Sequence, residues 1–162
     1  MPLGPPRSDG HNVDINYWVV KGRPSQNDFE AFLKPGELDR WYTGRPPKRW
    51  SEGDRVFFWR GSPACEIVGL GEFCGLTGEV DDQGKHTFEV RYETSVLRTP
   101  IAAEMLKADP LVGTASFLKS GPSGTVFPIS MEQARRMYEV VGDANRDAKH
   151  VWSDLRENHR RR

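Results

Sequence analysis

The apolar residues of this chain fall into short runs rich in β-branched and aromatic side chains, many of them bounded by glycine or proline. Runs of this length and composition predict strands. The expected strands cover residues 15–21, 55–60, 65–73, 86–96 and 125–129. The first is nearly continuous in apolar character, which indicates a strand buried on both faces. The second and third flank a short turn and predict a hairpin.

Helical signals are fewer. Ser25, with Asp28 three residues later, has the pattern of a helix N-cap and predicts a helix that ends before Pro35. Pro100 predicts the start of a short helix, and Ser130 is expected to cap a longer one. The apolar face of that last helix comprises Met131, Ala134, Met137, Tyr138 and Val141.

The order of these elements is strand, helix, loop, several antiparallel strands, short helix, strand and helix. It predicts an α+β fold in which a curved sheet wraps into a small open barrel, with short helices around it. Gly69 and Gly71 lie inside one expected strand and indicate a bend or a close approach to the backbone.

With 162 residues the chain has the length of one domain. We expect that domain to cover residues 14–141, after a flexible arm at 1–13 that is rich in proline and glycine. Residues 142–162 carry many charges and predict either a helix, which the spacing of Trp152 and Leu155 favours, or a frayed tail.

Charge and composition exclude several classes of protein. Lys plus Arg (23) equals Asp plus Glu (23), so binding to a polyanion requires a local basic face. No run approaches the roughly 18 apolar residues of a membrane-spanning helix, and the N-terminus has no apolar signal segment. Cys65 and Cys74 favour free thiols in a reducing cytosol over a disulfide. We therefore expect a cytoplasmic chain that makes no membrane contact.

Catalytic chemistry has little support in the sequence. The four histidines (His11, His86, His150 and His159) stand at neither metal-ligand nor nucleophile–base spacing. There is no P-loop and no GxGxxG motif. We therefore expect a protein that is not an enzyme and that binds no metal or cofactor.

Residues 40–60 differ from the rest of the chain because six basic side chains alternate there with six aromatic ones. Aromatic faces stack a nucleobase, and basic groups beside them hold its phosphates. Trp41 stands in a stretch rich in Gly, Pro and Arg, which predicts an exposed loop position. Phe57 has the pattern of a core residue, and strand alternation places it with Trp59 on one face and Phe58 on the other.

Several segments taken in order resemble the EVE domain, a PUA-like family related to the YTH readers of methylated adenine. They are Tyr17–Pro24, Trp41–Gly44, Gly53–Trp59, Ile67–Phe73, Ile101–Leu106 and Val126–Ser130. The resemblance covers roughly residues 15–141 and implies a PUA-like open pseudo-barrel. It also implies that a flipped, modified base is held between aromatic side chains.

The resemblance further implies a set of site residues. Lys21, Ser25 and Asn27 would line the pocket, and Trp41 and Trp59 would form two walls of an aromatic cage. Tyr42 and Thr43 would present hydroxyl or backbone groups to the base edge. From the basic residues of the window, Arg45 and Lys48 are expected to contact the flanking phosphates.

The expected function is a reader of a flipped base, with 5-methyl- or 5-hydroxymethylcytosine in DNA as the first choice. Two alternatives remain open at this point. The same fold is compatible with an RNA-binding module that reads N6-methyladenine or structured RNA, and the aromatic patch is compatible with a protein partner. A separate nuclease or ATPase effector is a further expected partner of a base reader, and we expect the chain to be a monomer.

Overall fold

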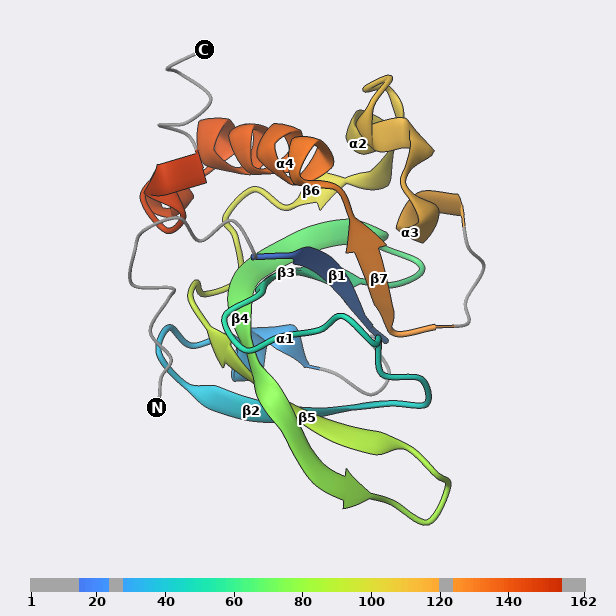
Figure 1. Cartoon of the computed structure of the whole chain (residues 1–162). Coiled ribbons are helices and arrows are strands. Elements are labelled where there is room, and N and C mark those ends of the chain that lie inside the picture. Colours follow the sequence, from blue (N-terminus) through green and yellow to red (C-terminus); the bar gives the residue numbers. More distant parts are fainter. Residues whose placement is uncertain (1–14, 24–27, 120–123, 156–162) are drawn as a thin grey trace.

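The computed structural model describes residues 15–23, 28–119 and 124–155. Its strands form one seven-stranded sheet in the order β2-β5-β4-β3-β1-β7, with β6 paired to β4 (Figure 1). The strands are β1 (Tyr17–Gly22), β2 (Leu38–Thr43), β3 (Arg55–Arg60), β4 (Glu66–Val80), β5 (His86–Tyr92), β6 (Ile101–Ala102) and β7 (Val126–Ile129). Among the described strands, β1 and β3 are the one parallel pair. The sheet is not closed, because β2 and β7 are its two edges.

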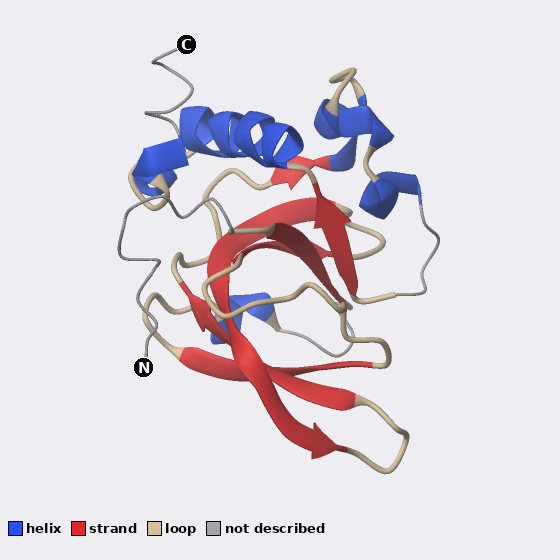
Figure 2. Cartoon of the chain, in the orientation of Figure 1, coloured by secondary structure: helices blue, strands red, loops and turns tan. Residues whose placement is uncertain are grey.

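Short helices surround the sheet (Figure 2). They are α1 (Phe29–Phe32), α2 (Ala103–Lys107), α3 (Ser116–Lys119) and α4 (Met131–Ala144), with 3-10 turns η2 (Val112–Thr114) and η3 (Arg146–Ala148). Helices α2, α3 and α4 gather at one end of the sheet, and α1 lies apart from them. The expected α+β class, with an open and mainly antiparallel sheet, is confirmed.

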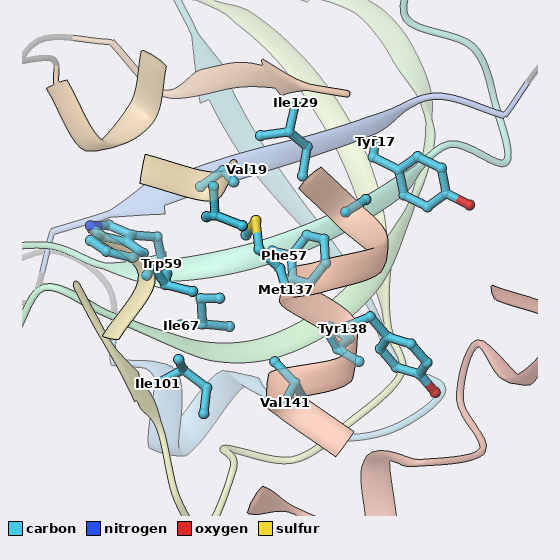
Figure 3. Packing of buried hydrophobic residues seen from close by; sticks show 14 of the residues in the cluster. Tyr17, Val19, Phe57, Trp59, Ile67, Ile101, Ile129, Met137, Tyr138 and Val141 are labelled. Atoms are coloured by element: carbon cyan, nitrogen blue, oxygen red, sulfur yellow. The ribbon is translucent and has the colours of Figure 1, made fainter. Parts of the chain in front are cut away.

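The sheet separates two hydrophobic cores. The α4-side core includes Val19, Phe57 and Trp59 and lies under α4 (Figure 3). The α1-side core includes Val20 and Phe58. Successive residues of β1 and β3 therefore enter opposite cores, as alternation along a strand requires. The expected placement of Phe57 and Trp59 on one face and Phe58 on the other is confirmed.

Two glycines let the strands pack closely. A Cβ on Gly71 would lie 2.6 Å from the carbonyl oxygen of Arg91 and 2.6 Å from the Phe58 ring. A Cβ on Gly69 would lie 3.0 Å from the methyl carbons of Leu33. The close approach expected at these two positions is confirmed, and a larger side chain at Gly71 would displace backbone.

Three local expectations are wrong. Asp28, rather than Ser25, is the N-cap of α1, and its side chain makes no capping hydrogen bond. Trp41 lies in strand β2 instead of a loop, because residues 38–43 pair with β5 along their whole length. Ile101 pairs with Ile67, so a short strand precedes the helix expected from Pro100. In the last two cases long-range pairing outweighs the local signal.

The C-terminal part of the described chain is well packed. Ser130 and Gln133 form a reciprocal capping box at the start of α4, as the serine predicts. Helix α4 continues to Ala144, and Trp152 and Leu155 are buried in the α4-side core. Of the two alternatives for residues 142–162, the part up to residue 155 is folded against the domain. The expected arm at 1–13 lies outside the described residues.

Candidate nucleic-acid interface

Trp41 is a core residue of this structure. Its side chain is 5% exposed and packs against the rings of Phe29 and Phe58, with centroid distances of 5.8 and 5.7 Å. Its indole N–H donates to the Tyr92 hydroxyl (3.0 Å), which in turn donates to Asp39 Oδ2 (2.5 Å). Burial and this bond to the carboxylate raise the pKa of Tyr92. The exposed position expected for Trp41 is therefore wrong.

Lys21 and Trp59 lie together on the opposite face of the sheet. They are register partners in β1 and β3, and Trp59 is 4% exposed in the α4-side core. The Lys21 ammonium donates to the carbonyl oxygen of Phe117 (2.8 Å) and lies 4.5 Å from the centre of the Phe127 ring. Burial lowers the pKa of Lys21, and the nearby Cys65 partly opposes that shift.

The expected cage residues do not form one site, since Trp41 and Trp59 belong to cores on opposite faces. Thr43 is also buried, and its hydroxyl accepts a hydrogen bond from the backbone N–H of Arg45 (3.3 Å). Tyr42 differs from these residues because it points outward from the edge strand and is 50% exposed. Ser25 and Asn27 lie outside the described residues.

The basic residues of the 40–60 window divide into two groups. Arg40, Arg55 and Arg60 form ion pairs with carboxylates. Those carboxylates belong to Glu79 and Glu89, to Asp154, and to Glu30 and Glu66. These three arginines therefore have acidic neighbours within the domain.

The second group of basic residues has no carboxylate partner among the described residues. Within residues 15–23, 28–119 and 124–155, the side chains of Arg45, Lys48 and Arg49 form no ion pair, and all three are exposed. They occupy residues 44–50, which we call the cationic loop. Arg45 and Lys48 are expected site residues, and Arg49 is an addition that only the ion-pair pattern reveals.

The cationic loop is held at both ends. Thr43 ends strand β2 at one side, and at the other Trp50 stacks on Phe73 with ring centroids 3.7 Å apart and an interplanar angle of 14°. Asp54 is buried, and its carboxylate accepts hydrogen bonds from the backbone N–H of Asn16 and Ser51 and from the Trp18 indole. Both ends of the loop are therefore anchored to the folded domain.

This arrangement suits contact with an extended anion. Three cations without an ion pair to any described residue lie on one loop, and the exposed ring of Tyr42 comes just before them in the chain. The described part of the chain holds no cluster of three or more His, Cys, Asp or Glu side chains placed to bind a metal. Both cysteines are free thiols. None of the described helices is long and apolar enough to cross a membrane.

Glu93, which the sequence does not single out, lies where β5 leads into the next segment. It lines a cavity and accepts a hydrogen bond from the Trp152 indole N–H (2.8 Å). Burial raises the pKa of this carboxyl above its ordinary value of 4.5, although the indole donor opposes the shift. The charged form is therefore less favourable in the folded chain than in the unfolded chain.

We expect Glu93→Gln to raise the melting temperature at pH 7 by a few degrees. A carboxyl with a raised folded pKa stabilises the fold fully only below its unfolded pKa, and this stabilisation is lost as the pH rises through the folded pKa. Glutamine keeps the acceptor for Trp152 and has no charge to bury. The difference between variant and parent, measured by thermal unfolding from pH 4 to pH 8, should grow with pH. A constant difference would contradict the raised pKa.

Comparison with known proteins shows which family this chain resembles in sequence and which solved structures it resembles in fold. A family model described as "EVE domain" matches residues 16–140. Among solved structures, a hypothetical protein from Leishmania major is 16% identical over 80% of this chain and 96% of its own, with a TM-score of 0.64. A protein from Rhodopseudomonas palustris is 23% identical over 85% of this chain and 98% of its own, with a TM-score of 0.59.

An ASCH protein from Zymomonas mobilis is 11% identical over 77% of this chain and 95% of its own, with a TM-score of 0.53. Comparison with the curated proteins found no match. At such low identities the likeness to the solved structures concerns the fold alone, whereas the family model matches most of the chain in sequence. The resemblance inferred from the sequence is confirmed, and the chain belongs to the EVE domain family.

Proposed function

We propose that this chain binds nucleic acid through the cationic loop and reads a modified base there, with 5-methyl- or 5-hydroxymethylcytosine in DNA as the ligand. The observation that carries the proposal is the charge pattern. In a chain with a formal net charge of zero, Arg45, Lys48 and Arg49 share one loop and form no ion pair with the residues that the structure describes. Exposed cations that are close together in the chain and form no ion pair with described residues are available to contact phosphates.

Membership of the EVE domain family supports the base-reading part of the proposal. Next to the cationic loop, Tyr42 has an exposed aromatic ring. We therefore assign to Tyr42 the base-stacking role that the sequence led us to expect of Trp41 and Trp59, which are buried. Stacking of a base on an aromatic ring contributes about 1–3 kcal/mol. The phosphate contacts then position the strand, and the ring contact supplies the preference for one base.

We expect the double variant Arg45→Ala/Lys48→Ala to flatten the salt dependence of DNA binding. Each phosphate contact contributes about −0.9 to the slope of log affinity against log salt, so the slope should change from about −2.7 to about −0.9. Fluorescence anisotropy of a labelled duplex at several salt concentrations measures this slope. The matched control is Lys85→Ala/Lys107→Ala, which removes the same charge from exposed positions elsewhere and should leave the slope unchanged.

The same titrations test base reading when the duplexes differ only in one cytosine methyl group. Tyr42→Ala should remove the preference for the methylated duplex and leave the salt slope nearly unchanged. Equal binding of both duplexes by the parent chain would overturn base reading in DNA, and preference for RNA with N6-methyladenine would support the alternative module. An unchanged slope in the Arg45→Ala/Lys48→Ala variant would show that the loop is not the interface.

A further inference from the structure

A cavity of about 560 Å³ lies on a different part of the domain from the cationic loop. One wall is the segment 93–99 that follows β5, and the other is the segment 144–148 that follows α4, with Pro35 at the side. The second wall lies beyond residue 140, where the match to the EVE domain ends. The cavity is therefore built in part by residues outside the matched domain.

Two arginines line this cavity, and two hydrogen bonds hold their backbone neighbours together. Asn145 Oδ1 accepts from the Thr99 N–H (2.8 Å), and Asn145 Nδ2 donates to the Thr99 carbonyl oxygen (3.0 Å). Arg98 precedes Thr99 and Arg146 follows Asn145, so both side chains start from one fixed junction. Neither arginine forms an ion pair with any residue that the structure describes. A guanidinium group binds phosphate oxygens in a bidentate manner, so either arginine of the lining can hold a phosphate.

Glu93 contributes an acceptor to the same cavity. Its Oε1 accepts from the Trp152 indole, and no described residue donates a hydrogen bond to its other carboxylate oxygen. A ligand amino group would fill that acceptor. Asp147 also lines the cavity, so the lining holds two carboxylates beside its two arginines. A ligand that fits has an anionic end and, away from it, an end that donates hydrogen bonds.

We propose that this cavity binds a nucleoside monophosphate whose base carries an exocyclic amino group. The phosphate contacts Arg98 and Arg146, and the amino group donates to Glu93. The cavity volume lies within the range of about 300–1,000 Å³ that is typical of small-molecule sites. The lining of this cavity includes no residue of the cationic loop, so an experiment can contradict either proposal without contradicting the other.

Isothermal titration calorimetry of the whole chain with adenosine monophosphate, purine riboside monophosphate and adenosine tests this site. Adenosine monophosphate should bind, and adenosine should bind at least about tenfold more weakly, because it lacks the charge-assisted contacts. Purine riboside monophosphate lacks the amino group and should bind with an intermediate affinity. Absence of binding by adenosine monophosphate, or equal affinity for all three ligands, would overturn the proposal.

Single substitutions test whether Arg98, Arg146 and Glu93 bind adenosine monophosphate. Arg98→Ala and Arg146→Ala should each weaken adenosine monophosphate about tenfold or more, whereas Lys85→Ala, at an exposed position on the hairpin turn, should not. Glu93→Gln should remove the preference for adenosine monophosphate over purine riboside monophosphate and retain phosphate binding. The mutated arginines are exposed, so thermal unfolding should show that these variants remain folded. Unchanged affinity in both arginine variants would place the ligand elsewhere.

Discussion

Replacing Trp152 with alanine is expected to lower the free energy of unfolding by about 3–5 kcal/mol, the range for large aromatic truncations in a core. The side chain is 1% exposed and contacts the rings of Phe57 and Tyr138, with centroid distances of 5.0 and 5.4 Å. Its loss also leaves the half-buried Glu93 carboxylate without its donor. Urea unfolding followed by circular dichroism measures the change, and the melting temperature should fall by about 10 °C.

His150→Ala is the matched control, since this neighbouring side chain is exposed. It should leave the unfolding midpoint within the error of the measurement. A loss of less than about 1 kcal/mol in the Trp152 variant, the range of ordinary substitutions, would contradict the placement of residues 145–155 within the folded unit.

Trp41→Ala is expected to destabilise the domain by about 3–5 kcal/mol as well, for a related reason. The truncation opens a void beside Phe29 and Phe58 and removes the indole donor from the Tyr92 hydroxyl. The Tyr92 hydroxyl keeps its bond to Asp39 but loses its second hydrogen bond, which adds to the cost. Chemical unfolding gives the difference in stability, and oligonucleotide binding is to be measured only under conditions in which the variant is folded.

Two further variants distinguish a contribution to folding stability from a contribution to ligand binding. Trp41→Phe keeps an aromatic ring and should recover part of the lost stability without restoring the bond to Tyr92. Tyr42→Ala removes an exposed ring and should change the unfolding free energy by less than about 0.5 kcal/mol, as is usual at surface positions. A stable Trp41→Ala variant would show that the indole is dispensable to the α1-side core.

The fold class could be predicted from sequence because its determinants are local. The β-branched and aromatic run at residues 15–21, the hairpin at 55–73 and the capping serine at Ser130 each indicate their structure within a few residues. The alternation of Phe57, Phe58 and Trp59 was enough to assign each side chain to a face. The structure confirms these elements.

The position of Trp41 could not be predicted in this way. Gly, Pro and Arg around it are typical of a loop, but strand β2 forms because it pairs with β5, more than forty residues away in the chain. The burial of an edge-strand tryptophan depends on a partner that no local pattern reveals. The same holds for Trp152, whose spacing from Leu155 fits either a helix or a tail.

The candidate site was predictable in part. The concentration of basic residues at 40–60 is visible in the sequence, whereas the division between paired and unpaired cations is not. Arg55 bonds to Asp154 and Arg60 to Glu30, across 99 and 30 residues of sequence. Only the folded chain brings these carboxylates to the arginines, and only then do Arg45, Lys48 and Arg49 stand out.

The anchoring of the cationic loop has an entropic consequence. The stacked Trp50 and the hydrogen bond from Ser51 to Asp54 anchor one end of the loop before any ligand arrives, and the bond from the Arg45 N–H to Thr43 anchors the other. A ligand then orders the long side chains of Arg45, Lys48 and Arg49, at a cost of about 0.5–1.5 kcal/mol for each, on a loop that is already closed. Because folding already closes the loop at both ends, the three charges meet a phosphate strand from a short segment whose ends do not have to be brought together again.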